Sequence, residues 1–246
     1  MSLIPKNIFM TWGNKDIPIL LKQRIHQIKK ENPDFNIYIY DDIDCMRFLA
    51  NNFPSQILNT YIALRPGAYK ADLWRCCILF KFGGIYMDIK LAPINGFKLN
   101  SLVNQEHFVK DRPKYSIYNA LIVSKNKNLF LKATIINIMN NVRMNYYGNS
   151  PLDPTGPILM GKIASNMNIK PNLIHAPEGG YILQNNKPII STEFKEYDSI
   201  RKTMTNKQKN PRYDIAWKNR KIYFRMPKIL NFVGYFKNKK ANPIKI

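Results

Sequence analysis

Two hydrophobic periods alternate along the first third of the chain. Apolar residues run together in Ile4–Trp12 and again in Asn36–Tyr40, which predicts buried strands. Apolar residues recur at helical spacing in Ile17–Glu31, and Ile43–Asn52 and Gly67–Phe82 also have helical patterns. Strands and helices that alternate in this way predict an α/β fold.

Further elements are predicted as far as residue 183. From Lys195 the chain becomes polar and basic, and the pattern predicts no element there. Because neither a repeat nor a low-complexity linker divides the chain, we expect one domain over residues 1–220 and a basic tail over residues 221–246. The later predicted elements are strands at His107–Val109, Ser116–Val123, Leu173–His175 and Tyr181–Leu183, a helix at Leu129–Val142, and a helix that opens in the loop Asp153–Pro157 and runs to about Met167.

One helix and the strand after it carry an unusual set of charges. Asp72 and Arg75 are three positions apart on the helix, so they share one of its faces. After a double glycine the residues alternate strictly, so that Tyr86, Asp88 and Lys90 point to one side of the predicted strand. Charges at the carboxyl end of a parallel strand lie where open sheets bind ligands. This segment therefore predicts a site where two acids and two cations meet.

Each part of that segment also has a purely structural explanation. An Asp–Arg pair at this spacing is common on helix surfaces, and Gly83-Gly84 can simply cap a helix. However, the neighbours of Asp72 and Arg75 are apolar, so the pair is expected to be buried, and a buried ion pair is costly to form. We therefore favour a functional role for the pair and for Asp88.

The chain is strongly basic. It has 38 Lys and Arg against 16 Asp and Glu, which gives a net charge of +22. Such a charge attracts polyanions, phosphorylated ligands or anionic lipid heads. The lysines are scattered among many Asn and Ile residues, which also fits the bias of an adenine- and thymine-rich gene. A nucleic-acid-binding domain remains the alternative from another class, although no RRM-like or helix-turn-helix signature supports it, so we expect no nucleic-acid partner.

Hydropathy indicates where the protein works. No apolar run approaches the roughly 20 residues that cross a bilayer, and the first residues lack a signal-peptide core, which predicts a cytoplasmic protein. The tail over residues 221–246 mixes apolar and basic residues, so it either forms a peripheral contact with an anionic membrane or packs on the domain. The cysteines and histidines are expected to be structural: Cys45, Cys76, Cys77, His26, His107 and His175.

The motifs together resemble the sugar-nucleotide glycosyltransferases of family 32. The most specific part is the charged helix with its double glycine and Ile85-Tyr86-Met87-Asp88, a pattern similar to that of the large glucosylating bacterial toxins. The resemblance spans roughly residues 4 to 220. It also includes Ile4–Trp12, Asn32–Phe35, Asp41-Asp42, Tyr118-Asn119, Thr155–Pro157, Tyr213 and Trp217.

The resemblance implies a GT-A-type fold with a mixed central sheet flanked by helices. It implies a hexosyltransferase of polysaccharide biosynthesis that uses a UDP- or GDP-sugar and retains the anomeric configuration. The acceptor would be a hydroxyl of a glycan, a lipid-linked saccharide or a protein.

The resemblance also assigns roles to individual residues. Trp12 would stack on the donor base, and Trp217 would close over the pyrophosphate. The remaining donor-binding residues would be Asp72, Arg75, Gly84, Tyr86 and Asp88, with Asp72, Arg75, Asp88 and Lys90 catalytic. The acceptor-side candidates are Asn119, Asp111 and Arg112.

Lys90 departs from the family pattern, because it stands where the second acid of an Asp-x-Asp motif would bind a metal with Asp88. A divalent ion in such enzymes offsets the charge that develops on the departing diphosphate. A lysine ammonium provides one positive charge and would repel a neighbouring cation. We therefore expect a weak or absent requirement for Mn²⁺ or Mg²⁺. The same substitution is also compatible with an inactive relative that binds its donor but does not transfer the sugar.

Overall fold

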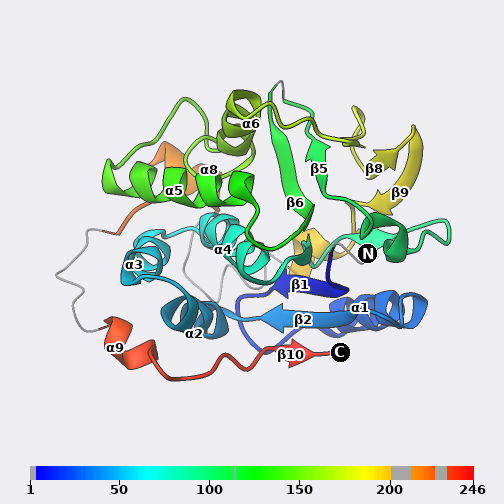
Figure 1. Cartoon of the computed structure of the whole chain (residues 1–246), viewed down its shortest axis with the longest axis horizontal. Coiled ribbons are helices and arrows are strands. Elements are labelled where there is room, and N and C mark those ends of the chain that lie inside the picture. The colour runs from blue at the N-terminus through cyan, green and yellow to red at the C-terminus, as the bar shows by residue number, and fades with distance from the viewer. Residues whose placement is uncertain (1–3, 114, 201–211, 225–231) are drawn as a thin grey trace.

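The computed structural model describes residues 4–113, 115–200, 212–224 and 232–246, and these form one mixed sheet with helices packed on it (Figure 1). The strand order in this sheet is β10-β2-β1-β3-β6-β5-β7-β8-β9-β4. The strands are β1 (Asn7–Thr11), β2 (Asn36–Tyr40), β3 (Gly84–Met87), β4 (Ala92–Pro93), β5 (His107–Lys110), β6 (Ile117–Ser124), β7 (Leu173–His175), β8 (Tyr181–Gln184), β9 (Lys187–Ser191) and β10 (Ile244–Lys245).

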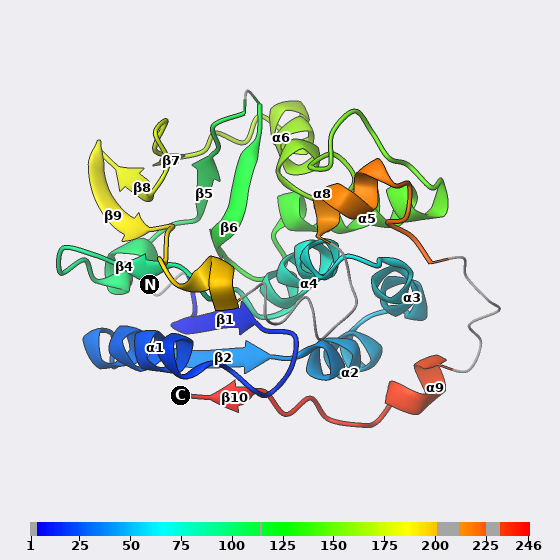
Figure 2. The ribbon, with the colours of Figure 1, turned by 180° about the vertical axis from the view of Figure 1, so that it is seen from behind.

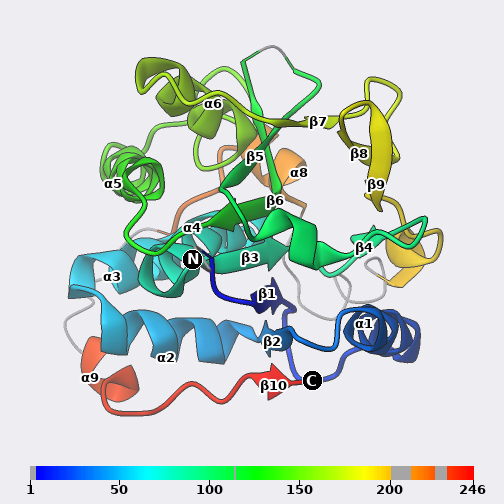
Figure 3. The same cartoon turned by 45° about the vertical axis from the view of Figure 1, so that its right-hand side comes forward.

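Helices pack on both faces of the sheet. They are α1 (Ile19–Glu31), α2 (Asp42–Asn52), α3 (Ser55–Ala63), α4 (Gly67–Phe82), α5 (Leu129–Arg143), α6 (Pro157–Asn166), α8 (Tyr213–Lys218) and α9 (Phe232–Phe236), with a 3₁₀ helix at Leu99–Leu102. Figure 3 shows α1 on one side of β1 and β2, with α2 and α3 on the other. This mixed α/β architecture confirms the predicted fold class.

Alternation along the central strands divides the apolar residues between two cores. Phe9 of β1 and Tyr86 of β3 belong to the core that includes residues of α2 to α6. Their neighbours Ile8 and Ile85 point the other way, into the core that includes α1. Because side chains alternate strictly along a strand, this division sets which residues of β3 face α4.

Helix α4 is apolar on nearly all sides, and its burial positions the charged pair. Trp74, Cys76 and Cys77 are fully buried, and the cysteines are free thiols, as predicted. A helix that is apolar all round packs inside the protein. Asp72 and Arg75 are therefore buried together with the helix that carries them.

The strand directions bring several chain segments to one edge of the sheet. β1 pairs in parallel with β2 and with β3, so the three strands end at the same edge. β6 is antiparallel to β3 and begins there, whereas β5 and β7, which pair in parallel, end there. Residues that follow β1, β3, β5 and β7 therefore meet residues near the start of β6.

Most predicted elements are present, and the structure adds others. α3, which lies between Pro54 and Pro66, was not predicted, and neither were β4, β9 and the 3₁₀ helix. α8, α9 and β10 lie in the polar and basic stretch for which the pattern predicts no element. The predicted strand through Lys90 ends at Met87, and Lys90 lies in a turn, with the backbone N–H of Leu91 donating to the carbonyl of Asp88 at 2.9 Å. The prediction that Lys90 lies on the strand was therefore wrong.

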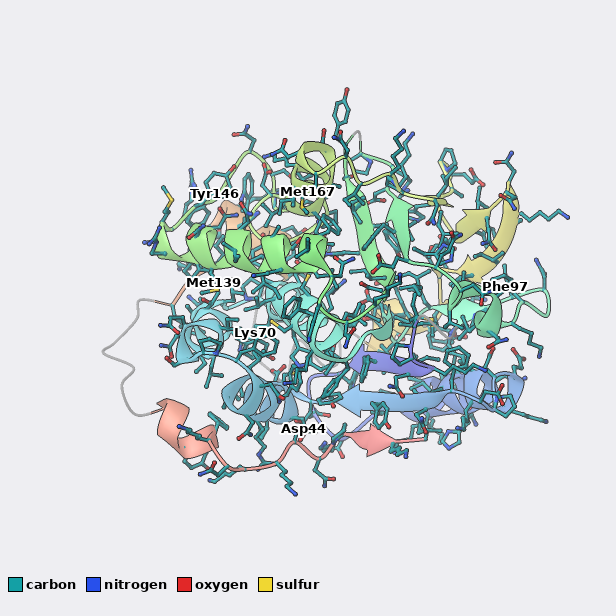
Figure 4. The ribbon with its side chains drawn as sticks, in the orientation of Figure 1. Asp44, Lys70, Phe97, Met139, Tyr146 and Met167 are labelled. Carbon is teal, nitrogen blue, oxygen red and sulfur yellow. The ribbon has the colours of Figure 1, made fainter. Side chains whose placement is uncertain are left out.

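The described part of the C-terminal tail packs on the domain. β10 adds to the sheet as an antiparallel neighbour of β2, and Phe236 of α9 is buried. Asp44, labelled beside α2 in Figure 4, accepts a hydrogen bond from the backbone N–H of Asn242 at 2.8 Å and contacts the ammonium of Lys15. Ile229 and Leu230, two apolar tail residues, lie outside the described residues. Among the described helices, none combines the length and apolar character that a membrane crossing requires.

Candidate active site

A cavity of about 580 Å³ opens at the edge where these strands end. This volume lies within the range of small-molecule sites, about 300–1,000 Å³. Nine of the residues to which the sequence analysis gave a donor-binding, catalytic or acceptor-side role line the cavity, and they come from five elements or the turns next to them. They are Trp12, Asp72, Arg75, Tyr86, Asp88, Lys90, Asp111, Arg112 and Asn119.

Arg75 links the helix to the strand that follows it. Its Nη2 lies 3.3 Å from Oδ1 of Asp72 and 3.6 Å from Oδ1 of Asp88. Its Nη1 donates to the backbone carbonyl of Asn119 at 2.6 Å, and its guanidinium lies 4.4 Å from the centre of the Tyr86 ring. Burial alone would lower the pKa of Arg75, but Tyr86 and the two carboxylates raise it above its usual value, so Arg75 stays charged.

Both carboxylate oxygens of Asp72 accept hydrogen bonds beneath the cavity surface. Oδ1 accepts from the side-chain amide of Asn119 at 2.9 Å, and Oδ2 accepts from the hydroxyl of Thr155 at 2.8 Å. A side chain at Gly156 would place its Cβ 3.2 Å from Oδ2, so the glycine leaves room for the carboxylate. Burial raises the pKa of Asp72, and Arg75 opposes that rise. Asp72 therefore holds the guanidinium of Arg75 in place.

Asp88 is the acid of this group that faces the cavity. Its side chain is 33% exposed, against 9% for Asp72 and 5% for Arg75. The Tyr86 hydroxyl donates to Oδ1 of Asp88 at 2.8 Å, and the backbone N–H of Asp88 donates to the carbonyl of Ala120 at 2.8 Å. The carboxylate is held on one oxygen, and substrate can approach it from the cavity.

Two aromatic rings form a wall of the cavity that Asp88 also lines. The rings of Trp12 and Tyr197 meet edge to face, with centres 6.4 Å apart, and the Trp12 indole N–H donates to the carbonyl of Asp16 at 3.3 Å. The Lys90 ammonium lies 5.8 Å from the centre of the Tyr197 ring. This wall offers a flat apolar surface and a cation, which suit a base and a phosphate. Tyr197 was not predicted, because it falls in a polar stretch without a clear period.

The wall formed by β5, β6 and β7 carries the acceptor-side candidates and one unpredicted residue. Oδ1 of Asp111 accepts from the backbone N–H of Arg112 at 2.8 Å and lies 2.8 Å from Nδ1 of His175. The His175 ring packs 4.1 Å from the ring of Tyr118, centre to centre. The sequence analysis treated His175 as structural, and only the pairing of β7 with β5 brings it to the cavity.

Two predicted donor-binding residues do not line the cavity. Gly84 begins β3, at the opposite end of the strand from Asp88, and a Cβ there would lie 2.7 Å from the carbonyl oxygen of Asn7. Gly84 therefore allows close approach of β1. Trp217 lies on α8, seen from behind in Figure 2, and its indole donates to the carbonyl of Tyr147 at 2.7 Å. Tyr213, at the start of α8, reaches the cavity instead.

The part of the chain that holds the Asp72–Arg75–Asp88 cluster matches a known family. Residues 18–109 match the family described as "Glycosyltransferase sugar-binding region containing DXD motif". The family resemblance expected from the sequence is confirmed over this region.

Several known glycosyltransferases are similar to this chain. Inositol phosphoceramide mannosyltransferase 3 of Schizosaccharomyces pombe is 30% identical over 91 residues, which are 37% of this chain and 25% of the relative. The uncharacterized glycosyltransferase L373 of Acanthamoeba polyphaga mimivirus is 26% identical over 147 residues, 53% of this chain and 57% of that protein. The initiation-specific alpha-1,6-mannosyltransferase of Candida albicans is 29% identical over 106 residues, 39% of this chain and 28% of that protein.

The matches to these relatives are partial. They cover between 25% and 57% of the relatives' own lengths. Among solved structures, the PaToxG glycosyltransferase aligns with 98% of this chain and 88% of its own, with a TM-score of 0.49 and 16% identity.

The two acids of the Asp72–Arg75–Asp88 cluster are already engaged by other groups of the protein. Asp88 already shares Oδ1 with Tyr86 and the nearby Arg75 guanidinium, and both oxygens of Asp72 are bound by neutral donors. Within the described residues, no three side chains of His, Cys, Asp or Glu come together as a metal-binding group. Lys90 lines the same cavity as Asp88 and adds a positive charge to it.

Proposed function

We propose that this protein is a glycosyltransferase that moves a hexose from a UDP- or GDP-sugar to the hydroxyl of a glycan, a lipid-linked saccharide or a protein. One observation carries the proposal: Arg75 lies close to both Asp72 and Asp88, and Asp88 faces a cavity with the volume of a small-molecule site. The family match over residues 18–109 supports a sugar ligand for this cluster.

Mannose is the hexose that the relatives favour. Two of the three relatives described above are named mannosyltransferases, and one of them is named for an inositol phosphoceramide. We therefore propose mannose as the hexose that this chain transfers. For the acceptor we propose only that it bears a hydroxyl.

The geometry supports separate roles along the cavity. Asp88 accepts hydrogen bonds from hydroxyls of the donor sugar, and Arg75 holds the carboxylate in place from behind. In the reaction the bond between the anomeric carbon and the phosphate oxygen breaks, and its electron pair leaves with the nucleoside diphosphate. A new bond forms between the acceptor oxygen and the anomeric carbon. Lys90, which lies beside the aromatic wall, offsets the negative charge of the leaving group.

The proposed transfer retains the anomeric configuration and does not require Mn²⁺ or Mg²⁺. Retention agrees with front-face displacement, in which the leaving phosphate takes the proton of the attacking hydroxyl, and also with a covalent intermediate on a carboxylate. The ammonium of Lys90 supports a reaction without Mn²⁺ or Mg²⁺, since it offers the cavity a positive charge where a second acid would bind a metal.

A donor screen tests the proposal. The protein is incubated with UDP-glucose, UDP-galactose, UDP-N-acetylglucosamine and GDP-mannose, with and without a chelator, and release of nucleoside diphosphate is measured. Release from at least one donor that survives chelation supports the proposal. Thermal stabilisation by UDP or GDP without any release would favour a relative that only binds its donor, the alternative that Lys90 keeps open. Thermal stabilisation by single-stranded DNA alone would instead favour a nucleic-acid-binding domain.

A further inference from the structure

Asp111 and His175 form a pair at the cavity edge, held by the sheet itself. β5 and β7 are parallel neighbours in which Lys110 pairs with Ile174, so Asp111, just beyond β5, lies beside His175, the last residue of β7. Oδ1 of Asp111 and Nδ1 of His175 are 2.8 Å apart, and both side chains are nearly buried. Both residues lie beyond residues 18–109, which the sugar-binding family covers.

The hydrogen bond sets the tautomer of the imidazole. An ionised carboxylate only accepts hydrogen bonds, so Nδ1 of His175 carries the proton and donates it to Asp111. In the neutral ring Nε2 then presents a lone pair. The backbone N–H of Arg112 also donates to Oδ1 of Asp111, which holds the carboxylate, and the Tyr118 ring packs on the imidazole.

Nε2 of His175 has no hydrogen-bond partner among the described residues. A buried polar atom without a partner is costly, and a ligand that donates to it removes the cost. Nε2 of His107 is equally unpartnered, with Nδ1 bound to the side chain of Asn172, yet His107 does not line the cavity. The two histidines therefore share their chemistry and differ in their access to a ligand.

Tyr118 connects the pair with the donor cluster. The Tyr118 ring packs on His175, and Tyr118 lines the cavity together with Asp88 and Asp111. Burial raises the pKa of Tyr118, and these two carboxylates raise it further. Asp88, Asp111 and His175 line the same cavity. A molecule bound at His175 thus occupies the same chamber as a sugar bound at Asp88.

We propose that Nε2 of His175 accepts a hydrogen bond from a hydroxyl of the acceptor, and that Asp111 positions the imidazole for this contact. The proposal rests on the proposed function, since it assumes a donor sugar at Asp88. The unpartnered lone pair of Nε2 selects a hydrogen-bond donor, and a polyol such as a sugar or inositol presents several. His175 is thereby a binding residue for the acceptor, and Asp111 is a positioning residue.

Paired asparagine variants test the contact. His175→Asn keeps an amide near the Nδ1 position, where it can donate to Asp111, and removes Nε2; His107→Asn makes the same change at the buried histidine outside the cavity. Transfer to methyl α-D-mannopyranoside and to myo-inositol is measured together with donor hydrolysis. We expect His175→Asn to lower the ratio of transfer to hydrolysis about tenfold, the effect of one lost hydrogen bond to a ligand.

The remaining variants sharpen that test. His107→Asn should keep the wild-type ratio, and His175→Gln, which returns an amide oxygen near the Nε2 position, should recover part of it. An unchanged ratio in His175→Asn, or an equal fall in His107→Asn, would overturn the proposal.

A second measurement is independent of activity. Imidazole ¹⁵N spectra of the protein, which has three histidines, report the tautomer of His175 and its response to the same two polyols. We expect a bare Nε2 in the free protein, a shift of its signal on adding polyol, and loss of the fixed tautomer in Asp111→Ala. A signal that neither polyol moves would reject the site, and a tautomer unaffected by Asp111→Ala would reject the positioning role. If no donor is hydrolysed, this titration still decides whether polyols bind at His175.

Discussion

Nη2 of Arg75, on α4, lies 3.6 Å from Oδ1 of Asp88, just beyond β3. The two residues belong to different elements that meet at one tight turn. Gly83 makes that turn with a φ of +67°, and a Cβ there would lie 2.7 Å from the backbone nitrogen of Asn126. The double glycine therefore brings the helix and the strand close enough for one guanidinium to hold the carboxylate that faces the cavity.

Asp88 is expected to be needed for turnover more than for folding. Asp88→Asn keeps the size of the side chain but removes the charge that accepts from donor hydroxyls. We expect nucleotide-sugar turnover to fall by about 100-fold or more, the usual effect of losing one electrostatic group in a reaction site. The melting temperature should change little, because the Asp88 side chain is partly exposed. Steady-state kinetics measure the turnover, and thermal unfolding measures the melting temperature.

Asp34→Asn is the matched control. Asp34 is an exposed acid whose ion pair with Lys6, at 3.2 Å, lies on the surface. It should leave turnover at the wild-type rate, since exposed ion pairs contribute little. Turnover within a few-fold of wild type in Asp88→Asn would contradict the assigned role.

Asp72 should make the stability of the protein depend on pH in a defined direction. Burial raises its pKa in the folded state, so folding favours the protonated acid. The resulting stability is fully present below the pKa of the unfolded chain and is lost as pH rises through the folded-state pKa, by about 1.4 kcal/mol for each unit of difference. Asp72→Asn cannot titrate and lacks this loss.

Denaturant unfolding of both proteins at several pH values measures the effect. The free energy of unfolding of the wild type relative to Asp72→Asn should decrease as pH rises from the acid range towards neutrality. An increase would mean that the Arg75 pairing outweighs burial and lowers the pKa instead.

Trp12 should report nucleotide binding by its fluorescence. Trp74 is fully buried and Trp217 lies away from the cavity, so of the three tryptophans only Trp12 lines it. We expect UDP or GDP to quench the emission of the wild type and of Trp217→Phe, and to quench Trp12→Phe much less. Equal quenching in Trp12→Phe and the wild type would show that the base binds elsewhere.

The sequence predicts best where the period is clear and the contacts are local. Asn36–Tyr40 and Gly67–Phe82 have the predicted bounds, and Asp72 and Arg75 share the predicted helix face. Asp88 meets them because the turn between helix and strand is short. These relationships involve fewer than twenty consecutive residues, so spacing alone is informative.

The residues that were missed depend on long-range pairing. His175 reaches Asp111 only because β7 pairs with β5, and no local pattern in either strand reveals that register. Lys90 was placed on a strand because the alternation continues through Ile89, but the chain turns after Met87. Trp217 was assigned from its place in the family pattern, whereas its indole donates to the carbonyl of Tyr147 and does not line the cavity.

Lys90 offers the last test, since a single substitution restores the acid that it replaces. Lys90→Asp creates the Asp-x-Asp pattern with Asp88, so a divalent ion would gain a second carboxylate and lose the repelling ammonium. We expect the wild type to keep its turnover in excess chelator. Lys90→Asp should be slow without metal and stimulated by Mn²⁺, at least tenfold if the ion replaces one charge on the leaving group. Lys132→Asp, which makes the same charge change on the exposed face of α5, should respond to Mn²⁺ as the wild type does. Loss of wild-type turnover in chelator, restored by Mn²⁺, would show that Lys90 does not take the place of the ion.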